Sequence, residues 1–159
     1  MNKILLIITG SIAASKCKEI ITLLNINEVK ISCILTNEAK KYVKISDIKK
    51  LPKNRMFTDE DEKKNKMLHI NLSRDNDLIV VCPATANSIA KFANGYGDNL
   101  ASNTLLASNK KILFVPAMNS FMWQNKINKK NVRLLKDIGH EFIGPTVGNL
   151  KCGEFGLGR

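Results

Sequence analysis

The chain repeats one pattern that restricts its fold: a short, unbroken aliphatic run ends at a small or polar residue, and a segment of helical periodicity follows. Such runs occupy residues 3–9, 29–35, 77–82 and 111–115. An aliphatic run without polar alternation is typical of a strand buried on both faces, as in parallel sheets covered by helices. The pattern predicts an α/β fold, a Rossmann-like three-layer α/β/α arrangement with a mostly parallel sheet.

The remaining elements follow from helical spacing and from breaks in it. We expect helices near 12–24, 68–74, 86–94, 99–108 and 125–138, and a last short strand at 141–143. Residues 44–66, with the acidic run 59–62, are predicted to be a surface excursion. No composition shift divides the chain, so residues 1–159 are expected to form a single domain.

Composition excludes several classes of protein. Hydrophobic residues make up 44% and charged residues 25% of the 159 positions, as in soluble globular proteins. The net charge of +11 comes almost entirely from Lys. Arg supplies most bidentate contacts to guanine and phosphate, and this chain has few Arg residues. No nucleic-acid partner is therefore expected.

The apolar runs and the cysteines limit the cellular context. The apolar run 4–8 is far shorter than the roughly 20 residues of a membrane-spanning helix, so no membrane association is expected. The four cysteines show no CxxC spacing, and no His pair completes a metal site. These features favour a cytoplasmic protein without a bound metal.

Small and polar residues follow the predicted strands, where ligands bind in such folds. The turn Gly10–Ser11 before a helix suits a phosphate group, although an ordinary turn with Ser11 as cap fits as well. The segment 83–87 could lie against a flat ring or could simply cap the next helix. In the segment 116–123, Asn119 stands among two Met, a Phe and the only Trp, which favours a small-molecule pocket over core packing.

Two further residues are candidates for chemistry. His69 is the better candidate general base, because His140 precedes a strand and is expected to be structural. The glycine-rich tail carries Cys152, either on a hinged flap or on a loose terminus. The residues alone leave that choice open.

Together these segments resemble the flavin-dependent cysteine decarboxylases. The resemblance covers nearly the whole chain outside about 44–66 and is carried by segments 9–14, 69–72, 83–95, 116–123 and 151–159. It implies FMN as cofactor, with the phosphate held by Gly10, Ser11, Ile12 and Ala13. It also implies flavin contacts from Thr36, Tyr42, Ala84, Thr85, Asn87 and Ser102.

The resemblance further implies a lyase of coenzyme A biosynthesis that acts on phosphopantothenoylcysteine. His69 would be the base, Asn119 would hold the substrate carboxylate beside Met122, and Cys152 would return a proton. Family members form trimers or dodecamers with shared active sites, so His69 would serve a neighbouring copy. A functional link to a phosphopantothenate–cysteine ligase is also implied.

Four alternative functions are considered for the same sequence. A peptidyl-cysteine decarboxylase shares the His69 and Asn119 blocks but does not need Cys152. A flavin prenyltransferase does not need the Asn119 block, and a non-catalytic flavin-binding regulatory subunit can lack one of the three residues. A nucleic-acid binder would rest on net charge alone.

Overall fold

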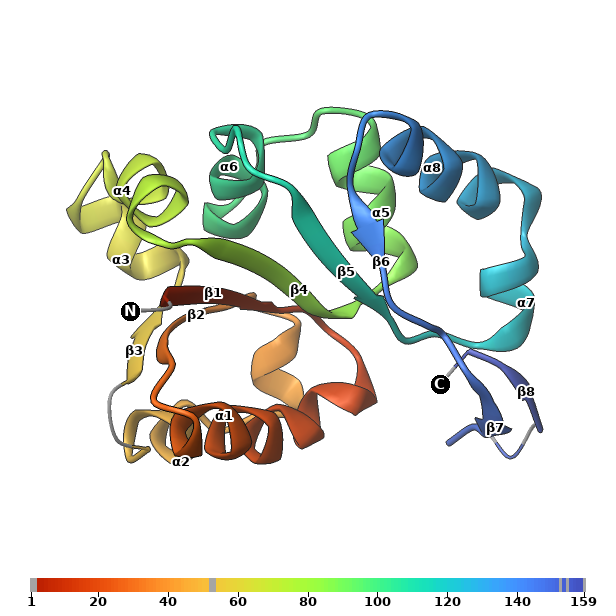
Figure 1. Cartoon of the computed structure of the whole chain (residues 1–159), viewed down its shortest axis with the longest axis horizontal. Coiled ribbons are helices and arrows are strands. Elements are labelled where there is room, and N and C mark those ends of the chain that lie inside the picture. Colours follow the sequence, from red (N-terminus) through yellow and green to blue (C-terminus); the bar gives the residue numbers. More distant parts are fainter. Residues whose placement is uncertain (1–2, 52–53, 152, 154, 159) are drawn as a thin grey trace.

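The computed structural model describes residues 3–51, 54–151, 153 and 155–158, and a six-stranded sheet forms its centre (Figure 1). Every neighbouring pair in this sheet is parallel, in the order β3-β2-β1-β4-β5-β6. The strands are β1 (Lys3–Ile8), β2 (Lys30–Leu35), β3 (Asn54–Phe57), β4 (Leu78–Ala84), β5 (Ile112–Pro116) and β6 (Glu141–Phe142).

Helices cover both faces of the sheet, which confirms the predicted three-layer fold. α1 and α2 lie on one face, and α4, α5, α6 and α8 lie on the other (Figure 1). The helical segments are η1 (Ile12–Lys16), α1 (Cys17–Ile26), η2 (Ala39–Lys41), α2 (Ile45–Lys49), α3 (Asp59–Lys64), α4 (Leu68–Asp75), α5 (Ala86–Ala93), α6 (Leu100–Leu106), α7 (Ser120–Gln124) and α8 (Lys126–Asp137).

The first strand shows why its sequence is apolar without alternation. Leu5 and Ile7 are fully buried in the core cluster under α4, α5, α6 and α8. Leu6 and Ile8 are buried in the cluster under α1 and α2. Since successive side chains point to opposite faces, a strand covered on both sides needs an apolar residue at every position.

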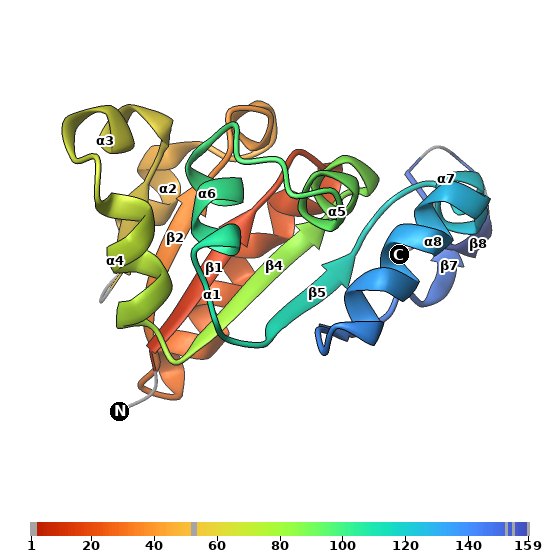
Figure 2. The same cartoon turned by 90° about the horizontal axis from the view of Figure 1, so that it is seen from above.

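The strand order places a crevice at the carboxyl ends of β1 and β4. The chain runs outward from β1 through β2 to β3 and then crosses back to β4 on the other side of β1. The connections that leave β1 and β4 therefore diverge, and ligands in open parallel sheets bind at such a point. Figure 2 shows β1 and β4 side by side, ending near α5 and α6.

The prediction for residues 44–66 was wrong, because this stretch contains α2, β3 and α3. β3 was missed because it has only four residues, of which two are polar, so its sequence lacks the aliphatic signal. The acidic run forms α3, where Thr58 and Asp61 make a capping box. Asp59 also reaches α6, since its Oδ1 accepts a hydrogen bond from the Leu100 N–H at 3.0 Å.

The described part of the tail is ordered as a hairpin rather than loose. Its antiparallel strands are β7 (Val147–Asn149) and β8 (Phe155–Leu157). The Met118 N–H donates to the Gly158 carbonyl at 3.0 Å, which fixes the hairpin beside α7. No helix in the described ranges is long and apolar enough to cross a membrane.

Candidate active site

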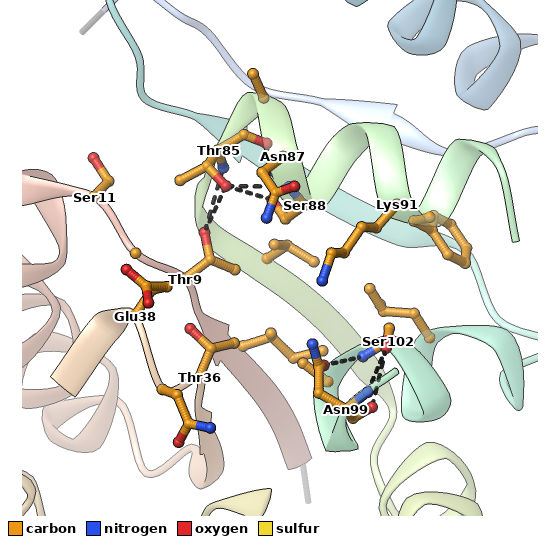
Figure 3. A pocket seen from close by; sticks show the side chains of 18 of the residues that line it. Thr9, Ser11, Thr36, Glu38, Thr85, Asn87, Ser88, Lys91, Asn99 and Ser102 are labelled. Atoms are coloured by element: carbon orange, nitrogen blue, oxygen red, sulfur yellow. Dashed lines mark hydrogen bonds between the residues drawn. The ribbon is translucent and has the colours of Figure 1, made fainter. Parts of the chain in front are cut away.

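A cavity of about 750 Å³ opens at the carboxyl ends of the central strands (Figure 3). Its size falls in the range of small-molecule and cofactor sites. Its lining residues come from β1 and β4, from the loops after β1, β2, β4 and β5, and from α3, α5, α6 and α7. They are Ile7, Thr9, Gly10, Ser11, Thr36, Asn37, Glu38, Asp59, Val81, Thr85, Ala86, Asn87, Ser88, Lys91, Phe92, Asp98, Asn99, Ala101, Ser102, Leu105, Ala117, Met118 and Met122.

Hydrogen bonds between Thr9 and the β4 loop fix the centre of this cavity. The buried Thr9 hydroxyl donates to the Pro83 carbonyl at 2.6 Å and accepts from the Thr85 N–H at 3.3 Å. The Thr85 hydroxyl accepts from the Ser88 N–H at 3.1 Å and so caps α5. The loops after β1 and β4 are therefore held at a fixed separation (Figure 3).

The turn after β1 needs a glycine at position 10. A Cβ at Gly10 would lie only 2.4 Å from the Glu38 Cβ, so any side chain there would push the η2 segment away. The next residue, Ser11, caps η1 by accepting from the Ala13 N–H at 3.3 Å. On the facing loop, the Thr36 hydroxyl donates to the Ile8 carbonyl at 3.2 Å.

Charged and polar residues of α5 and α6 form the opposite wall. Lys91 and Asp98 make an ion pair, and the Lys91 ammonium lowers the pKa of Asp98. The Ser102 hydroxyl accepts from the N–H groups of Asp98 and Asn99 at 3.0 and 3.1 Å. This network holds the loop between α5 and α6 against the cavity.

The structure places the residues predicted to bind cofactor in two groups. Gly10, Ser11, Thr36, Thr85, Asn87 and Ser102 line the cavity, as does Met122, predicted for substrate. Ile12, Ala13, Tyr42 and Ala84 lie outside its lining: Ile12 and Tyr42 are exposed, and Ala84 is buried in β4.

The predicted catalytic residues are not brought together within one chain. His69 lies on α4, and its Nδ1 is 2.9 Å from the Glu62 Oε1. Asn119 precedes α7, and its Oδ1 accepts from the N–H groups of Phe121 at 2.8 Å and Met122 at 3.4 Å. α4 and α7 stand at opposite ends of the molecule in both views (Figures 1 and 2). Cys152 lies outside the described residues.

Sequence reasoning missed five charged residues near the site, namely Glu38, Asp59, Glu62, Lys91 and Asp98. Glu62 was assigned to a surface excursion, and nothing in the acidic run singles it out from its neighbours. Lys91 and Asp98 are separated by a turn, so their pairing depends on how α5 and α6 meet. No cluster of three metal-ligating side chains occurs in the part of the chain that is described.

The residues around the cavity fit an FMN molecule. Ile7, Val81 and Leu105 supply apolar surface on which a flat ring can lie. Hydroxyl and amide groups of Thr36, Asn87 and neighbouring residues stand around this surface and can hydrogen-bond a polar ring edge. At one end, Gly10 leaves room for close backbone approach, and the cap at Ser11 begins a helical segment whose N–H groups suit a phosphate.

Comparison with known proteins agrees with this geometry. The model of the Flavoprotein family matches residues 1–159. A probable phosphopantothenoylcysteine decarboxylase of Streptococcus mutans is 34% identical over 99% of this chain and 90% of its own length. A bifunctional coenzyme A biosynthesis protein of Bacillus subtilis is 35% identical, and the chain spans 39% of that longer protein.

Two solved structures are similar over the whole fold. A PPC decarboxylase variant complexed with pantothenoylaminoethenethiol superposes with a TM-score of 0.91 and is 29% identical, over 99% of this chain and 89% of the other. The FMN binding protein AtHal3 gives a TM-score of 0.86 at 31% identity, over 99% of this chain and 88% of the other.

Proposed function

The chain belongs to the Flavoprotein family, and on that basis we propose that it is an FMN-dependent carboxy-lyase that converts 4′-phospho-N-pantothenoylcysteine to 4′-phosphopantetheine. The single observation that carries the proposal is the cavity at the carboxyl ends of β1 and β4, which fits a flavin and reaches Met122 beside Asn119. The named relatives act in coenzyme A biosynthesis, which supplies the substrate class.

In this proposal FMN binds along the cavity. Gly10, Ser11, Ile12 and Ala13 would hold the phosphate, and Thr36, Tyr42, Ala84, Thr85, Asn87 and Ser102 would contact the ring system. Of these, Ile12, Ala13, Tyr42 and Ala84 are outside the cavity lining. When bound, FMN supplies a two-electron acceptor that oxidises the carbon bearing the thiol and later returns the electrons. Oxidation at that carbon is needed because a cysteine carboxylate alone leaves no electron sink when CO₂ departs.

His69 is proposed as the base that removes a proton during this oxidation. Its Nδ1 is buried and lies 2.9 Å from a Glu62 carboxylate oxygen, without hydrogen-bond geometry, and Nε2 is the nitrogen proposed to take the substrate proton. The carboxylate also stabilises the imidazolium that forms. The Glu62 side chain is only 19% exposed and accepts a hydrogen bond from Asn103 Nδ2 on α6, which limits its movement.

Asn119 is proposed to hold the substrate carboxylate until CO₂ leaves. Its Oδ1 accepts from two N–H groups at the start of α7, which fixes the orientation of the side chain. Met122 adds an apolar contact at the cavity wall. Cys152, which lies between β7 and β8 in the sequence, is proposed to protonate the ene-thiolate that remains.

The separation of His69 and Asn119 supports a site shared between two copies of the chain. Since α4 and α7 lie at opposite ends of one molecule, one chain cannot bring both side chains to one substrate. Exposed apolar residues near α7 and β8 give a surface for association: Phe121 is 75%, Ile127 72% and Phe155 74% exposed. We therefore propose a homotrimer, or a dodecamer built from four trimers.

Mixing variants tests this sharing directly. Chains with His69→Asn keep an intact Asn119, and chains with Asn119→Ala keep an intact His69. Separately they should be inactive, and after unfolding and refolding together some interfaces combine both intact residues and regain activity. Mixtures that stay inactive, although the two chains assemble together, would contradict a shared site.

The Bacillus subtilis relative suggests a functional link to another enzyme. There the matched region makes up 39% of a bifunctional protein. We propose that this chain takes its substrate from a phosphopantothenate–cysteine ligase.

The function is tested by incubating the flavin-loaded protein separately with phosphopantothenoylcysteine and with a peptide ending in cysteine. The proposal predicts CO₂ release from the first only. CO₂ release from the peptide alone would instead identify a peptidyl-cysteine decarboxylase. A bound flavin with no release from either would favour a regulatory role.

A further inference from the structure

The flavin cavity has more negative than positive side chains in its lining. Among the described residues, the charged ones that line it are Glu38, Asp59, Lys91 and Asp98. Three of these are carboxylates, and Lys91 is the one cation that this chain supplies to the lining in its described part. An excess of negative charge disfavours an anionic ligand. FMN carries a phosphate and its ring gains negative charge on reduction, so the place of this cation matters for the cofactor.

Each of the three carboxylates has a partner. Glu38 pairs with Lys41, which lies outside the cavity lining. Asp59 accepts a hydrogen bond from the first N–H of α6 at 3.0 Å. Asp98 pairs with Lys91. The pair of Lys91 and Asp98 is therefore the ion pair of which both members line the cavity.

Hydrogen bonds hold the Lys91 ammonium in a defined place. Lys91 extends from α5 towards Asn99 and Ser102 at the start of α6 (Figure 3). One carboxylate oxygen of Asp98 pairs with Lys91, and the other accepts from the Asn99 Nδ2 at 3.0 Å. Asn99 is itself fixed, because its Oδ1 accepts from the Ser102 N–H at 2.9 Å. The positive charge is thus already oriented at the cavity wall before a ligand binds.

Lys91 lies away from the turn that suits the phosphate. Figure 3 shows Ser11 and Lys91 on opposite sides of the cavity. The two helices that form the wall around Lys91 also carry Phe92, Ala101 and Leu105, which supply apolar lining. In the proposed binding mode the ammonium therefore lies beside the ring system and not beside the phosphate.

The proposed reaction adds negative charge to that ring system. When the carbon bearing the thiol is oxidised, it loses a hydride to the flavin and the thiol loses a proton to the base. A thioaldehyde and a protonated base result, and the ring holds one extra negative charge. A fixed cation beside the ring binds this reduced form better than the oxidised form. Tighter binding of the reduced form raises the potential of the bound flavin by linkage.

We propose that Lys91 sets the electron affinity of the bound flavin: its ammonium, held by Asp98, stabilises the negative charge that the ring gains with two electrons. The inference deepens the proposed function and rests on its FMN site. Asp98 has two opposing effects, because its carboxylate positions the ammonium and also offsets part of its charge.

The midpoint potential of bound FMN, measured against a reference dye during slow reduction, tests the proposal without substrate turnover. Lys91→Gln should lower the potential by about 30 mV or more, a tenfold fall in the ratio of reduced to oxidised flavin. Lys91→Arg keeps the charge and should stay near the wild-type potential. Asp98→Asn removes the offsetting charge and should raise the potential. Lys129→Gln on α8 removes one positive charge outside the cavity lining and is the matched control, with an unchanged potential.

Equal potentials for the wild type, Lys91→Gln and Asp98→Asn would overturn the proposal. A Lys91→Gln protein that binds FMN more weakly at an unchanged potential would do so as well, since Lys91 would then serve binding alone. If Lys91→Gln does not retain FMN, Asp98→Asn decides the result, and a potential that does not rise contradicts the proposal.

The same measurement separates this inference from the proposed function. A wild-type protein that binds no flavin would overturn the FMN site on which both depend. The expected shifts in potential, in a protein that releases no CO₂ from its substrate, would support the role of Lys91 and reject only the proposed reaction.

Discussion

The Gly158 carbonyl accepts a hydrogen bond from the Met118 N–H at 3.0 Å, and a Cβ on Gly158 would fall 2.2 Å from the Met118 carbonyl oxygen. The backbone of the tail therefore touches the backbone of the segment that carries Asn119. Gly156 repeats this approach, since its Cβ would lie 2.4 Å from the Ser120 Oγ. Gly158, just after β8, is required by this backbone contact with the proposed substrate segment, whereas at Gly156 the neighbouring atom is the end of the Ser120 side chain.

Replacing Gly158 by Ala should therefore displace the hairpin. We expect turnover to fall about tenfold or more while flavin binding is kept, because the flavin cavity does not include β8. Val147→Ala is the control: Val147 is 60% exposed in the same hairpin, and its truncation should leave turnover unchanged. Steady-state kinetics would measure turnover, and flavin fluorescence would measure flavin binding. Normal turnover of the Gly158 variant would contradict the proposed role of this contact.

His69 and Glu62 should differ in the size of their effects. His69→Asn removes the proposed base and should lower kcat about 100-fold or more. Glu62→Gln keeps an oxygen beside the imidazole but loses the charge, so a smaller loss is expected. The kcat of the two variants, measured with saturating flavin, gives the comparison. An equal loss for both, or no loss for His69→Asn, would exclude the proposed roles.

Thr85 should contribute to stability through its cap on α5. Thr85→Ala removes the acceptor for the Ser88 N–H and should lower the free energy of unfolding by about 1 kcal/mol. Thr85→Ser keeps the hydroxyl and is the matched control. Urea unfolding of the flavin-free protein would show the difference as a shift in midpoint at constant slope. Identical midpoints for the two variants would disprove the cap's contribution.

His140 should make stability depend on pH. Its Nδ1 accepts from the Ile112 N–H at 3.3 Å and its ring lies 5.2 Å from that of Phe92, and burial lowers its pKa below the ordinary 6.5. Well above pH 6.5 the ring is neutral in both the folded and the unfolded chain. Below it the unfolded chain binds a proton that the folded chain resists, so stability falls as pH drops towards the folded pKa.

His140→Leu removes this titration. The free energy of unfolding of the variant should change less than that of the wild type between pH values on either side of 6.5. Denaturant titrations at both pH values would measure this free energy of unfolding. Equal pH dependence of the two proteins would assign the effect to other groups.

The sequence predicted the strands and helices that carry a strong local signal. β1, β2, β4 and β5 are aliphatic because both of their faces are buried, and this demand is visible in the sequence. β3 lies at the sheet edge and has polar residues, so its pairing with β2 depends on the tertiary fold. The antiparallel hairpin of the tail was not predicted, because its glycines lie close to Met118 and Ser120, which are distant in the sequence.

In the candidate site too, some residues could be predicted from the local sequence and others depend on the tertiary fold. Gly10, Thr85 and Asn87 stand directly after strands, so their place at the cavity could be predicted from position alone. The proximity of Glu62 to His69 depends on how α3 packs on α4, so it could not be predicted from the sequence. The prediction for Ile12 and Ala13 followed from the family resemblance, and the structure places them beside the cavity rather than in its lining.

The central claim is tested most directly by the mass of the product formed from 4′-phospho-N-pantothenoylcysteine by the flavin-loaded protein. We predict a product that has lost CO₂ and nothing else, which is 4′-phosphopantetheine. Substrate of unchanged mass would contradict the proposed reaction, and a product that lacks two further hydrogens would contradict the return of electrons to the substrate.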